Sequence, residues 1–551
     1  MSERGHLDVE DARREQSLTR SGVAMATGTL ASRITGFLRT VVIAAALGHL
    51  GDAYNVANTI PNILYDLLLG GLLSSIVIPL LVQAASSEED HGVAYAQRLL
   101  TMVTTVLAVI AVIGVLLAPE VVDVYGGKLS PADRELATTF ARYFLPQVFF
   151  YGLGAVLAAI LNTRGSFAAP MWAPVLNNLV VIGSGALFLA VTSHEPRAAA
   201  LSNGQTLVLA LGTTGGIVLQ TIALAPALRA ARFPLKLRWD WRRAGFRSAG
   251  PFAGWMLSYV VTNQLGYLVI VNLATASGKA RHSSGFGYSA YTYAYVLFSL
   301  PYAVIAVSVI TALFPRMSRS AVEDRRGELA NTLAGGLTMS ATLLVPMTAA
   351  LVALGPLIGA VVFAHGNLGL SDARLTGATL AAFGIGLVPF SAFQVQLRGW
   401  LALRDARTPA LVNLAITALN VLADVLLYVL LPAREKVVGL ALGFVLSYVI
   451  GSLWFARLLR KRLGPANEHR VGRTLVRLSV ASTIAVVPAY AAARALTAGL
   501  GLDPESSLVA LVVAVLIGSA IFMSLARRMR IRELDELLTM VRGRLGGRTA
   551  P

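Results

Sequence analysis

The sequence contains no cysteine and few charged residues, and both absences restrict what the chain can be. Without cysteine there is no disulfide, no thiolate nucleophile and no cysteine-ligated metal. Only 14% of the 551 residues are charged, whereas soluble domains carry about 25%. Hydrophobic residues make up 56%, and the mean hydropathy is +0.67. This composition is that of an integral membrane protein.

Catalytic and nucleotide-binding motifs are also missing. There is no Walker A lysine motif and no convincing serine nucleophile elbow. The seven histidines lack metal-ligand spacing and fall in tails, loops or the ends of hydrophobic segments: His6, His49, His91, His194, His282, His365 and His469. We therefore expect a protein that is not an enzyme and has no cofactor. A cation gradient or the membrane potential is the expected energy source, with Na⁺ or H⁺ as candidate coupling ions.

The basic residues are placed as a membrane protein requires. The formal net charge is +17, but the Lys and Arg residues lie mainly between hydrophobic segments. Positive cytoplasmic loops and anionic lipid headgroups explain that distribution, so we expect contact with membrane phospholipids and no nucleic-acid partner. Residues 1–20 are polar and lack a signal-peptide core, which predicts a flexible cytoplasmic tail.

The hydrophobic segments predict an all-α integral membrane protein with about 14 transmembrane helices, because about 20 apolar residues cross a bilayer. The expected spans are 22–48, 53–84, 95–118, 135–162, 167–192, 205–229, 249–275, 287–315, 330–355, 374–402, 408–432, 437–459, 474–499 and 506–526. The connections assigned to the cytoplasm are richer in Lys and Arg than those opposite, which predicts that both termini are cytoplasmic.

The spans are expected to form two pseudo-symmetric six-helix lobes followed by two C-terminal helices. The segment 159–178 in the first half resembles 401–420 in the second half, and such weak internal symmetry is common in secondary transporters. A chance similarity is the alternative. The predicted organisation is a tail at 1–20, an N-lobe at 21–230, a basic cytoplasmic linker at 231–248, a C-lobe at 249–463, spans 13 and 14 at 470–530, and a basic cytoplasmic tail at 531–551.

Two arginines lie within the first apolar segment. Arg33 and Arg39 are too far from its ends for easy snorkelling, so we expect both to face the bundle interior or water. A bend at Gly36, midway between them, would bring both guanidinium groups toward one cavity. Arginine binds phosphate through paired hydrogen bonds and stays protonated. We favour anion binding; the alternative is an internal salt bridge, for instance with Asp66.

Acidic and amide side chains within the spans form a second candidate set. Asn420 and Asp424 are four residues apart and therefore share one helix face. Carboxylate and amide oxygens are suitable ligands for a small cation, and the carboxylate is also a candidate proton carrier. A hydrogen bond between helices is an equally good explanation. Asn263 is a weaker candidate for a further oxygen ligand.

Several of these segments resemble the MurJ (MviN) lipid II flippase family, of the multidrug/oligosaccharidyl-lipid/polysaccharide exporter superfamily. The resemblance is carried by ASRITGFLRTVVIAAALG, GDAYNVANTIPNIL and SSIVIPLL near the start, and by ILNTRGSFAAPMWAPVLNN, FAHGN and RDARTP further on. It covers nearly the whole chain and is closest to actinobacterial members. It implies two six-helix lobes around a central cavity, with the last two helices lining a groove for a polyprenyl tail.

The resemblance also implies a function. Lipid II, an undecaprenyl-pyrophosphate-linked peptidoglycan precursor, would move from the cytoplasmic to the outer leaflet of the bacterial cytoplasmic membrane by alternating access, driven by membrane potential or a cation gradient. Arg33 and Arg39 match the arginine pair that engages the pyrophosphate, and Asp52 matches an aspartate near the external gate. Asn55 and Asp66 complete the predicted substrate-binding set. Lipid II is the expected partner, together with phospholipids and cell-wall synthesis proteins.

Asn420 and Asp424 match an Asn-x-x-x-Asp that is a sodium site in some family members. At other positions the chain departs from well-studied relatives, because Tyr65, Gly70 and Val296 stand where those relatives carry charged residues. Two other functions remain open on the same superfamily fold: translocation of another lipid-linked oligosaccharide, and cation-coupled multidrug export. A membrane scaffold without transport is a third alternative.

Overall fold

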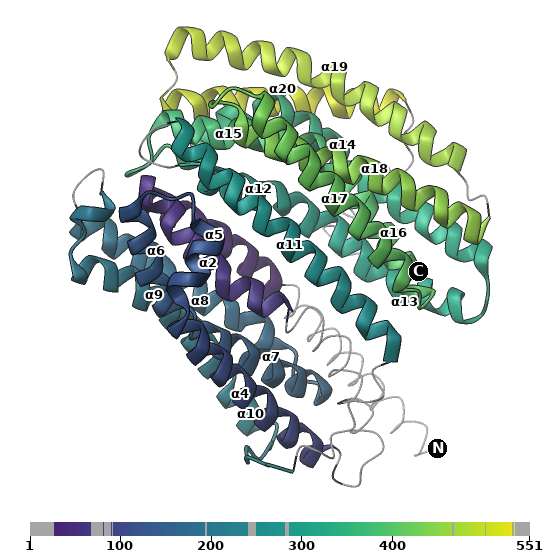
Figure 1. Cartoon of the computed structure of the whole chain (residues 1–551). Coiled ribbons are helices and arrows are strands. Elements are labelled where there is room, and N and C mark those ends of the chain that lie inside the picture. The colour runs from purple at the N-terminus through teal and green to yellow at the C-terminus, as the bar shows by residue number, and fades with distance from the viewer. Residues whose placement is uncertain are drawn as a thin grey trace, which may run out of the picture. The chain divides into compact units, whose positions relative to one another are not determined.

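The computed structural model of the chain contains helices joined by turns and short irregular segments, with no strand among the residues that it describes (Figure 1). It describes residues 27–67, 81, 90, 92–192, 196–240, 250–281, 286–464, 468–501, 503–529, 531 and 534. The predicted tail at 1–20, Gly70, the second half of the predicted linker at 241–248, and nearly all of the predicted tail at 531–551 lie outside these residues. The described helices form two compact units, residues 1–260 and 261–551.

Unit 1 begins with a helix over residues 27–47, which η1 (Gly48–Leu50) connects to α2 (Gly51–Tyr65). Gly48 has a φ of +50°, a backbone conformation that glycine adopts without strain, and it interrupts the helix at this point. The remaining elements are α4 (Val93–Leu116), α5 (Ala118–Gly126), α6 (Pro131–Phe144), α7 (Gln147–Thr163), α8 (Ala168–Val191), η3 (Ala198–Ala200), α9 (Asn203–Ile222) and α10 (Ala225–Ala230).

Helix starts in unit 1 follow directly from the local sequence. Ser130 accepts a hydrogen bond from the backbone N–H of Asp133, and Pro131 occupies the first helical position of α6. Ser202 and Gln205 form a reciprocal capping box at the start of α9. Within the unit α2 packs on α6, α4 on α7, and α8 on α9. Leucine, isoleucine and valine side chains of α4 and α7 are buried in one of these contacts.

Unit 2 contains most of α11 (Gly250–Arg281), whose first residues belong to unit 1. It continues with α12 (Tyr288–Pro301), a single π turn η6 (Tyr302–Ala306), α13 (Val307–Val322), α14 (Arg326–Phe363), α15 (Leu370–Ile385), α16 (Leu387–Ala402), α17 (Arg407–Leu430), α18 (Lys436–Leu463), α19 (Glu468–Leu500) and α20 (Pro504–Arg528). Aromatic rings from α12, α15, α16 and α18 form its centre, where Phe298, Phe383 and Phe444 pack within 5.3–5.7 Å of one another.

The last two helices are integrated into unit 2. α19 packs on α20, and both pack on α14. Their shared surface is built from small residues, with Ala489, Ala493, Ala510 and Ala514 buried beside Leu354. Lipid tails are as apolar as leucine, so the hydrophobic effect does not drive membrane helices together. Small side chains let the helices approach closely, and the resulting packing holds them together.

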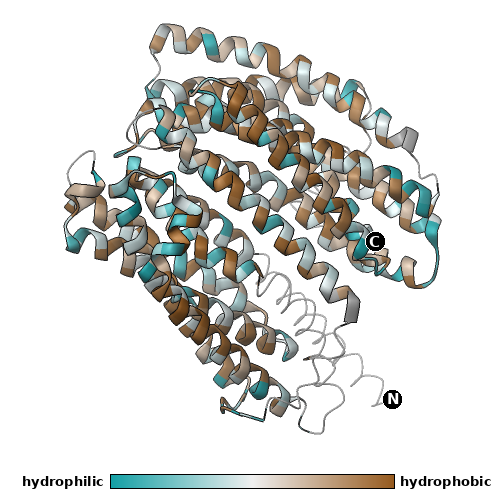
Figure 2. Ribbon diagram, viewed as in Figure 1, coloured by the Kyte–Doolittle hydropathy of each residue, from teal (hydrophilic) through white to brown (hydrophobic). Residues whose placement is uncertain are grey.

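The predicted spans agree with the observed helices. Among the described residues, 12 helices are long and apolar enough to cross a membrane, or 13 when α15 and α16, which meet at 50°, count as one span. The predicted first and second spans fall in one continuous helical run, Thr27–Tyr65, and the predicted second span also extends beyond the described residues. Each predicted span from the third onward corresponds to one observed span, with α15 and α16 together counted as one. Figure 2 shows the apolar residues along the helix lengths. The all-α membrane fold is thus confirmed.

The described part of the predicted linker, residues 231–240, runs along α4. Gln97 Nε2 donates a hydrogen bond of 2.6 Å to the carbonyl of Pro234, and the N–H of Arg238 donates one of 2.8 Å to Thr101 Oγ1. Arg98 Nε lies 2.8 Å from Asp240 Oδ2. This hydrogen bond from Arg98 lowers the pKa of the Asp240 carboxyl below its usual value. The segment is therefore attached to unit 1 at three points.

Candidate functional site

The two arginines of the first helix differ in exposure. Arg33 lies on an exposed face together with Leu30 and Ile34, each of which is 52% exposed, whereas Arg39 is half-buried. Six residues separate the arginines, so their α-carbons are about 9 Å apart along the helix axis. Arg33 is thus accessible from outside unit 1, and Arg39 lies among its helices.

The segment between the arginines is held firmly by α8. The helix is continuous through Gly36. Asn178 Nδ2 donates hydrogen bonds of 3.1 Å to the carbonyl of Ser32 and 3.0 Å to Thr35 Oγ1. A Cβ at Gly36 would lie 3.4 Å from the same Asn178 nitrogen. This is an ordinary van der Waals distance, so Gly36 faces α8 without an approach that only glycine would permit.

Arg39 lies near a group of tyrosines. It interacts electrostatically with Tyr54 of α2 and Tyr151 of α7. The Tyr151 ring lies 5.0 Å from the ring of Tyr65 at the end of α2. Tyr54 is fixed by a 2.7 Å hydrogen bond between its hydroxyl and Thr213 Oγ1 on α9. The half-buried guanidinium is thus near enough to Tyr54 and Tyr151 to interact with them electrostatically.

The other predicted substrate-binding residues of unit 1 are distributed along α2. Asp52 and Asn55 at its start are 2% and 9% exposed, whereas Asp66 directly follows its end and is exposed. The structure therefore buries Asp52 and Asn55 and exposes Asp66.

Unit 2 contains a buried carboxylate with one unsatisfied oxygen. Asn420 Nδ2 donates a hydrogen bond of 2.9 Å to Asp424 Oδ2. Asp424 is 0% exposed, and its Oδ1 has no hydrogen-bond partner in the described part of the chain. The structure thus brings together the two residues that their spacing places on one face of α17. It does not satisfy the carboxylate completely.

The surroundings of Asp424 are tight. Gly443 of α18 faces Oδ1 so closely that a Cβ at this position would collide with it. Tyr291 of α12 interacts electrostatically with the carboxylate. Asn263 is half-buried on α11, one turn before Gly266, which approaches Thr417 of α17. The carboxylate thus lies among α17, α18 and α12, with α11 beside α17.

The donor set around Asp424 suits a small hard cation or a proton better than a transition metal. Among the described residues, no group of three His, Cys, Asp or Glu side chains is close enough to hold a metal ion. Asn420 presents its N–H to Oδ2, so Oδ1 of Asp424 is the oxygen left to accept a small cation or a proton.

Comparison with known proteins identifies the family. The family model described as lipid II flippase MurJ matches residues 43–525. The chain belongs to the MurJ family. The match begins four residues after Arg39, so the MurJ family model does not itself cover Arg33 or Arg39.

Individual relatives agree with this membership. The chain is 28% identical over 446 residues to the lipid II flippase MurJ of Burkholderia cenocepacia, covering 79% of this chain and 82% of the relative. It is 26% identical over 472 residues to the probable lipid II flippase MurJ of Haemophilus influenzae, covering 81% and 86%.

Solved structures show the same fold. A structure of lipid II flippase MurJ in an inward closed conformation matches with a TM-score of 0.72 at 19% identity, covering 92% of this chain and 99% of that one. An inward-facing multidrug resistance MATE family transporter of the MOP superfamily matches with a TM-score of 0.59 at 13% identity, covering 80% and 99%. The fold is therefore shared by MurJ and MATE proteins.

Three residues around these sites do not stand out in the sequence. Tyr54 and Tyr151 lie near Arg39, and Gly443 lies against Asp424. Tyrosine and glycine are common in membrane helices, and the partners lie on helices far apart along the chain. Their spacing therefore gives no signal of these contacts.

Proposed function

We propose that this chain translocates lipid II from the cytoplasmic to the outer leaflet of the bacterial cytoplasmic membrane. The observation that carries the proposal is the match to the lipid II flippase MurJ family model over residues 43–525. Named relatives that match over about four-fifths of the chain support it. The helical fold with at least 12 candidate spans in the described residues suits such a carrier.

The first helix supplies the charge that the substrate requires. Lipid II carries a pyrophosphate, and an arginine fork donates paired hydrogen bonds to phosphate oxygens. Exposed Arg33 makes the first contact, and half-buried Arg39, about 9 Å further along the axis, holds the pyrophosphate during the change between the two access states. The polyprenyl tail stays in lipid, and the last two helices, α19 and α20, provide its groove.

Asp424 couples transport to an ion gradient. Na⁺ would be held by Asn420 and Asp424 and, less directly, by Asn263. Alternatively, Asp424 alone would hold a proton. Either cation would neutralise the buried carboxylate. The unpartnered Oδ1 of Asp424 supports this assignment. Binding that favours one conformation shifts the population toward it, which resets the carrier.

A cation-coupled multidrug exporter is the second candidate. The buried Asp424 favours it, since such an exporter needs an acidic residue that binds cations. Exposed Arg33 disfavours it, because a guanidinium repels cationic drugs.

Complementation of a flippase-depleted bacterial strain tests the main proposal. We expect the intact chain to restore growth and the appearance of lipid II in the outer leaflet. Failure to restore translocation, with normal amounts of protein in the membrane, contradicts it. Restored export of cationic dyes without lipid II translocation would instead establish the exporter. Reporter fusions to each end test our further proposal that both termini are cytoplasmic.

A further inference from the structure

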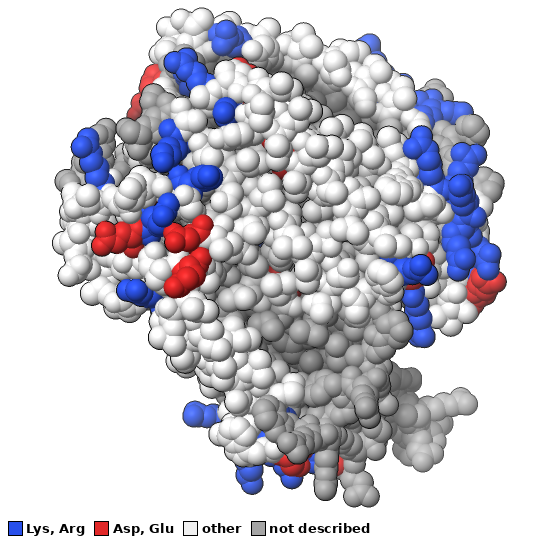
Figure 3. All heavy atoms as spheres, in the orientation of Figure 1, with Lys and Arg blue, Asp and Glu red and all other residues white. Residues whose placement is uncertain are grey.

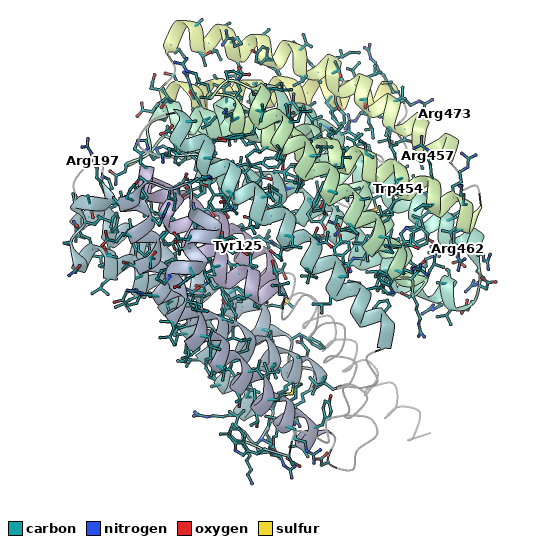
Figure 4. The ribbon with its side chains drawn as sticks, in the orientation of Figure 1. Tyr125, Arg197, Trp454, Arg457, Arg462 and Arg473 are labelled. Atoms are coloured by element: carbon teal, nitrogen blue, oxygen red, sulfur yellow. The ribbon has the colours of Figure 1, made fainter. Side chains whose placement is uncertain are left out.

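The C-terminal end of α18 carries a basic hollow that the transport proposal does not use. It has a volume of about 520 Å³ and is lined by Trp454, Arg457, Leu458, Arg460 and Lys461. Figure 4 shows Trp454 and Arg457 at this end of the helix. Figure 3 shows a band of Lys and Arg spheres over the same end of unit 2. Among the residues that the structure describes, no acidic one lines the hollow.

An exposed apolar stripe on α18 leads directly to this hollow. Leu446, Ile450 and Leu453 are 45%, 39% and 53% exposed. Their spacing of four and three residues places them on one helix face, and Arg457, four residues beyond Leu453, continues that face. The rise from Leu446 to Arg457 is about 16 Å, which is close to half of a hydrocarbon core about 30 Å thick. The stripe therefore has the length of one leaflet.

Trp454 lies at the boundary between the apolar stripe and the basic hollow. It is 39% exposed and belongs to the hollow, next to the last exposed leucine of the stripe. Tryptophan concentrates at membrane–water interfaces because one side of its ring is apolar and its N–H is polar. Its position marks the level at which acyl chains meet headgroups.

We propose that this surface is a binding site for an anionic diacyl phospholipid. The phosphodiester occupies the hollow, where Arg457 donates paired hydrogen bonds and Lys461 adds a point charge. An acyl chain lies along Leu446, Ile450 and Leu453. Basic pockets beside transmembrane helices bind anionic headgroups through this chemistry.

Basic residues at the last turn of a helix have another explanation that involves no ligand, because they offset the partial negative charge of the helix's carbonyl end. α20 provides the comparison, because Arg527 and Arg528 occupy its last turn and lie outside the hollow. On α18 such cations occur together with the hollow, the tryptophan and the leaflet-long stripe. The combination selects a molecule with one anionic end and one apolar end.

Fluorescence quenching by brominated lipids tests the site in the full-length protein. Purified protein is reconstituted in bilayers of phosphatidylcholine containing either dibrominated phosphatidylglycerol or dibrominated phosphatidylcholine. We expect stronger quenching by the brominated phosphatidylglycerol, and we expect Trp454→Phe to remove the difference. Equal quenching by the two brominated lipids overturns the proposal.

The double variant Arg457→Gln/Lys461→Gln tests the charge. Each cation near an anionic surface contributes about 1 kcal/mol, so we expect the preference for phosphatidylglycerol to fall about 30-fold, which corresponds to about 2 kcal/mol. The matched control Arg527→Gln/Arg528→Gln removes the same charge from α20 and is expected to keep the preference. A preference that survives in the α18 variant overturns the proposal.

Two further measurements distinguish the phospholipid from other molecules that could occupy the same surface. Excess inorganic phosphate should leave the quenching unchanged; loss of quenching would assign the hollow to a free phosphate and overturn the lipid site. Dilution of the protein in the bilayer should also leave quenching unchanged. Quenching that rises as the protein is diluted would mean that a second copy of this chain covers the stripe, which equally overturns it.

Discussion

Asn420 donates a 2.9 Å hydrogen bond to one carboxylate oxygen of Asp424, while the other oxygen is buried without a hydrogen-bond partner in the described part of the chain. A buried carboxylate in this state is costly unless a cation or proton completes it. The pair is therefore the natural place to test ion coupling.

Asp424→Asn keeps the shape of the side chain and removes its charge. We expect lipid II translocation in proteoliposomes to respond to an imposed Na⁺ or pH gradient in the unmodified protein and to lose that response in the variant. Asp324→Asn, at an exposed position between α13 and α14, is the control and should keep the response. An unchanged gradient response in Asp424→Asn would refute the coupling role.

Gly443→Ala tests the packing against Asp424. The added methyl group collides with Oδ1, so α17 and α18 must separate or the carboxylate must move. We expect a destabilisation of about 1–3 kcal/mol, the usual cost of overpacking, measured as a lower midpoint of thermal unfolding in detergent. Gly335→Ala on α14 is the matched control, since nothing lies within 4 Å of its Cβ. It should be neutral or stabilising, because alanine favours helices.

Arg33→Ala and Arg39→Ala test the pyrophosphate assignment. We expect each to abolish lipid II translocation while the amount of protein in the membrane fraction stays normal. Arg142→Ala, an exposed arginine in the last turn of α6, is the control and should retain transport. Normal translocation in both Arg33→Ala and Arg39→Ala would remove the assignment.

The ion pair between Arg98 and Asp240 predicts a pH dependence of the linker. Because the chain has no cysteine, Lys236→Cys provides a unique site for a nitroxide label. The pKa of Asp240 is lowered from 3.8 by the Arg98 hydrogen bond. The ion pair therefore stabilises the attached linker fully above pH 3.8. This stabilisation is lost as the pH falls through the lower pKa that Asp240 has in the folded protein.

We expect the electron paramagnetic resonance spectrum to show an immobilised label at neutral pH and a more mobile one in acid. Arg98→Gln should produce the mobile spectrum already at neutral pH, whereas Arg229→Gln, an exposed arginine of α10, should not. A label that is equally immobile in Arg98→Gln at neutral pH would show that the two backbone contacts alone fix the linker.

The number and positions of the spans follow from the sequence with little ambiguity. An apolar run of about 20 residues has few alternatives to a membrane helix, because every backbone polar group must be satisfied within lipid. The first two predicted spans are the exception, because residues 27–65 form one helical run in which only the three residues of η1 separate the two parts. The pairing of Asn420 with Asp424 was also predictable, because residues four apart share a helix face.

Contacts between distant helices were not predictable. Nothing in the spacing shows that Gly443 lies against Asp424, that Asn178 holds the helix beside Gly36, or that Tyr151 lies near Arg39. The sequence determines by itself that this is a multi-spanning membrane protein with two arginines in its first helix. Tertiary structure alone decides that Arg33 is exposed, that Arg39 is half-buried, and that one oxygen of Asp424 lacks a partner. The physical reason is that hydropathy depends on each residue's own chemistry, whereas exposure and hydrogen bonding depend on what the neighbouring helices place beside it.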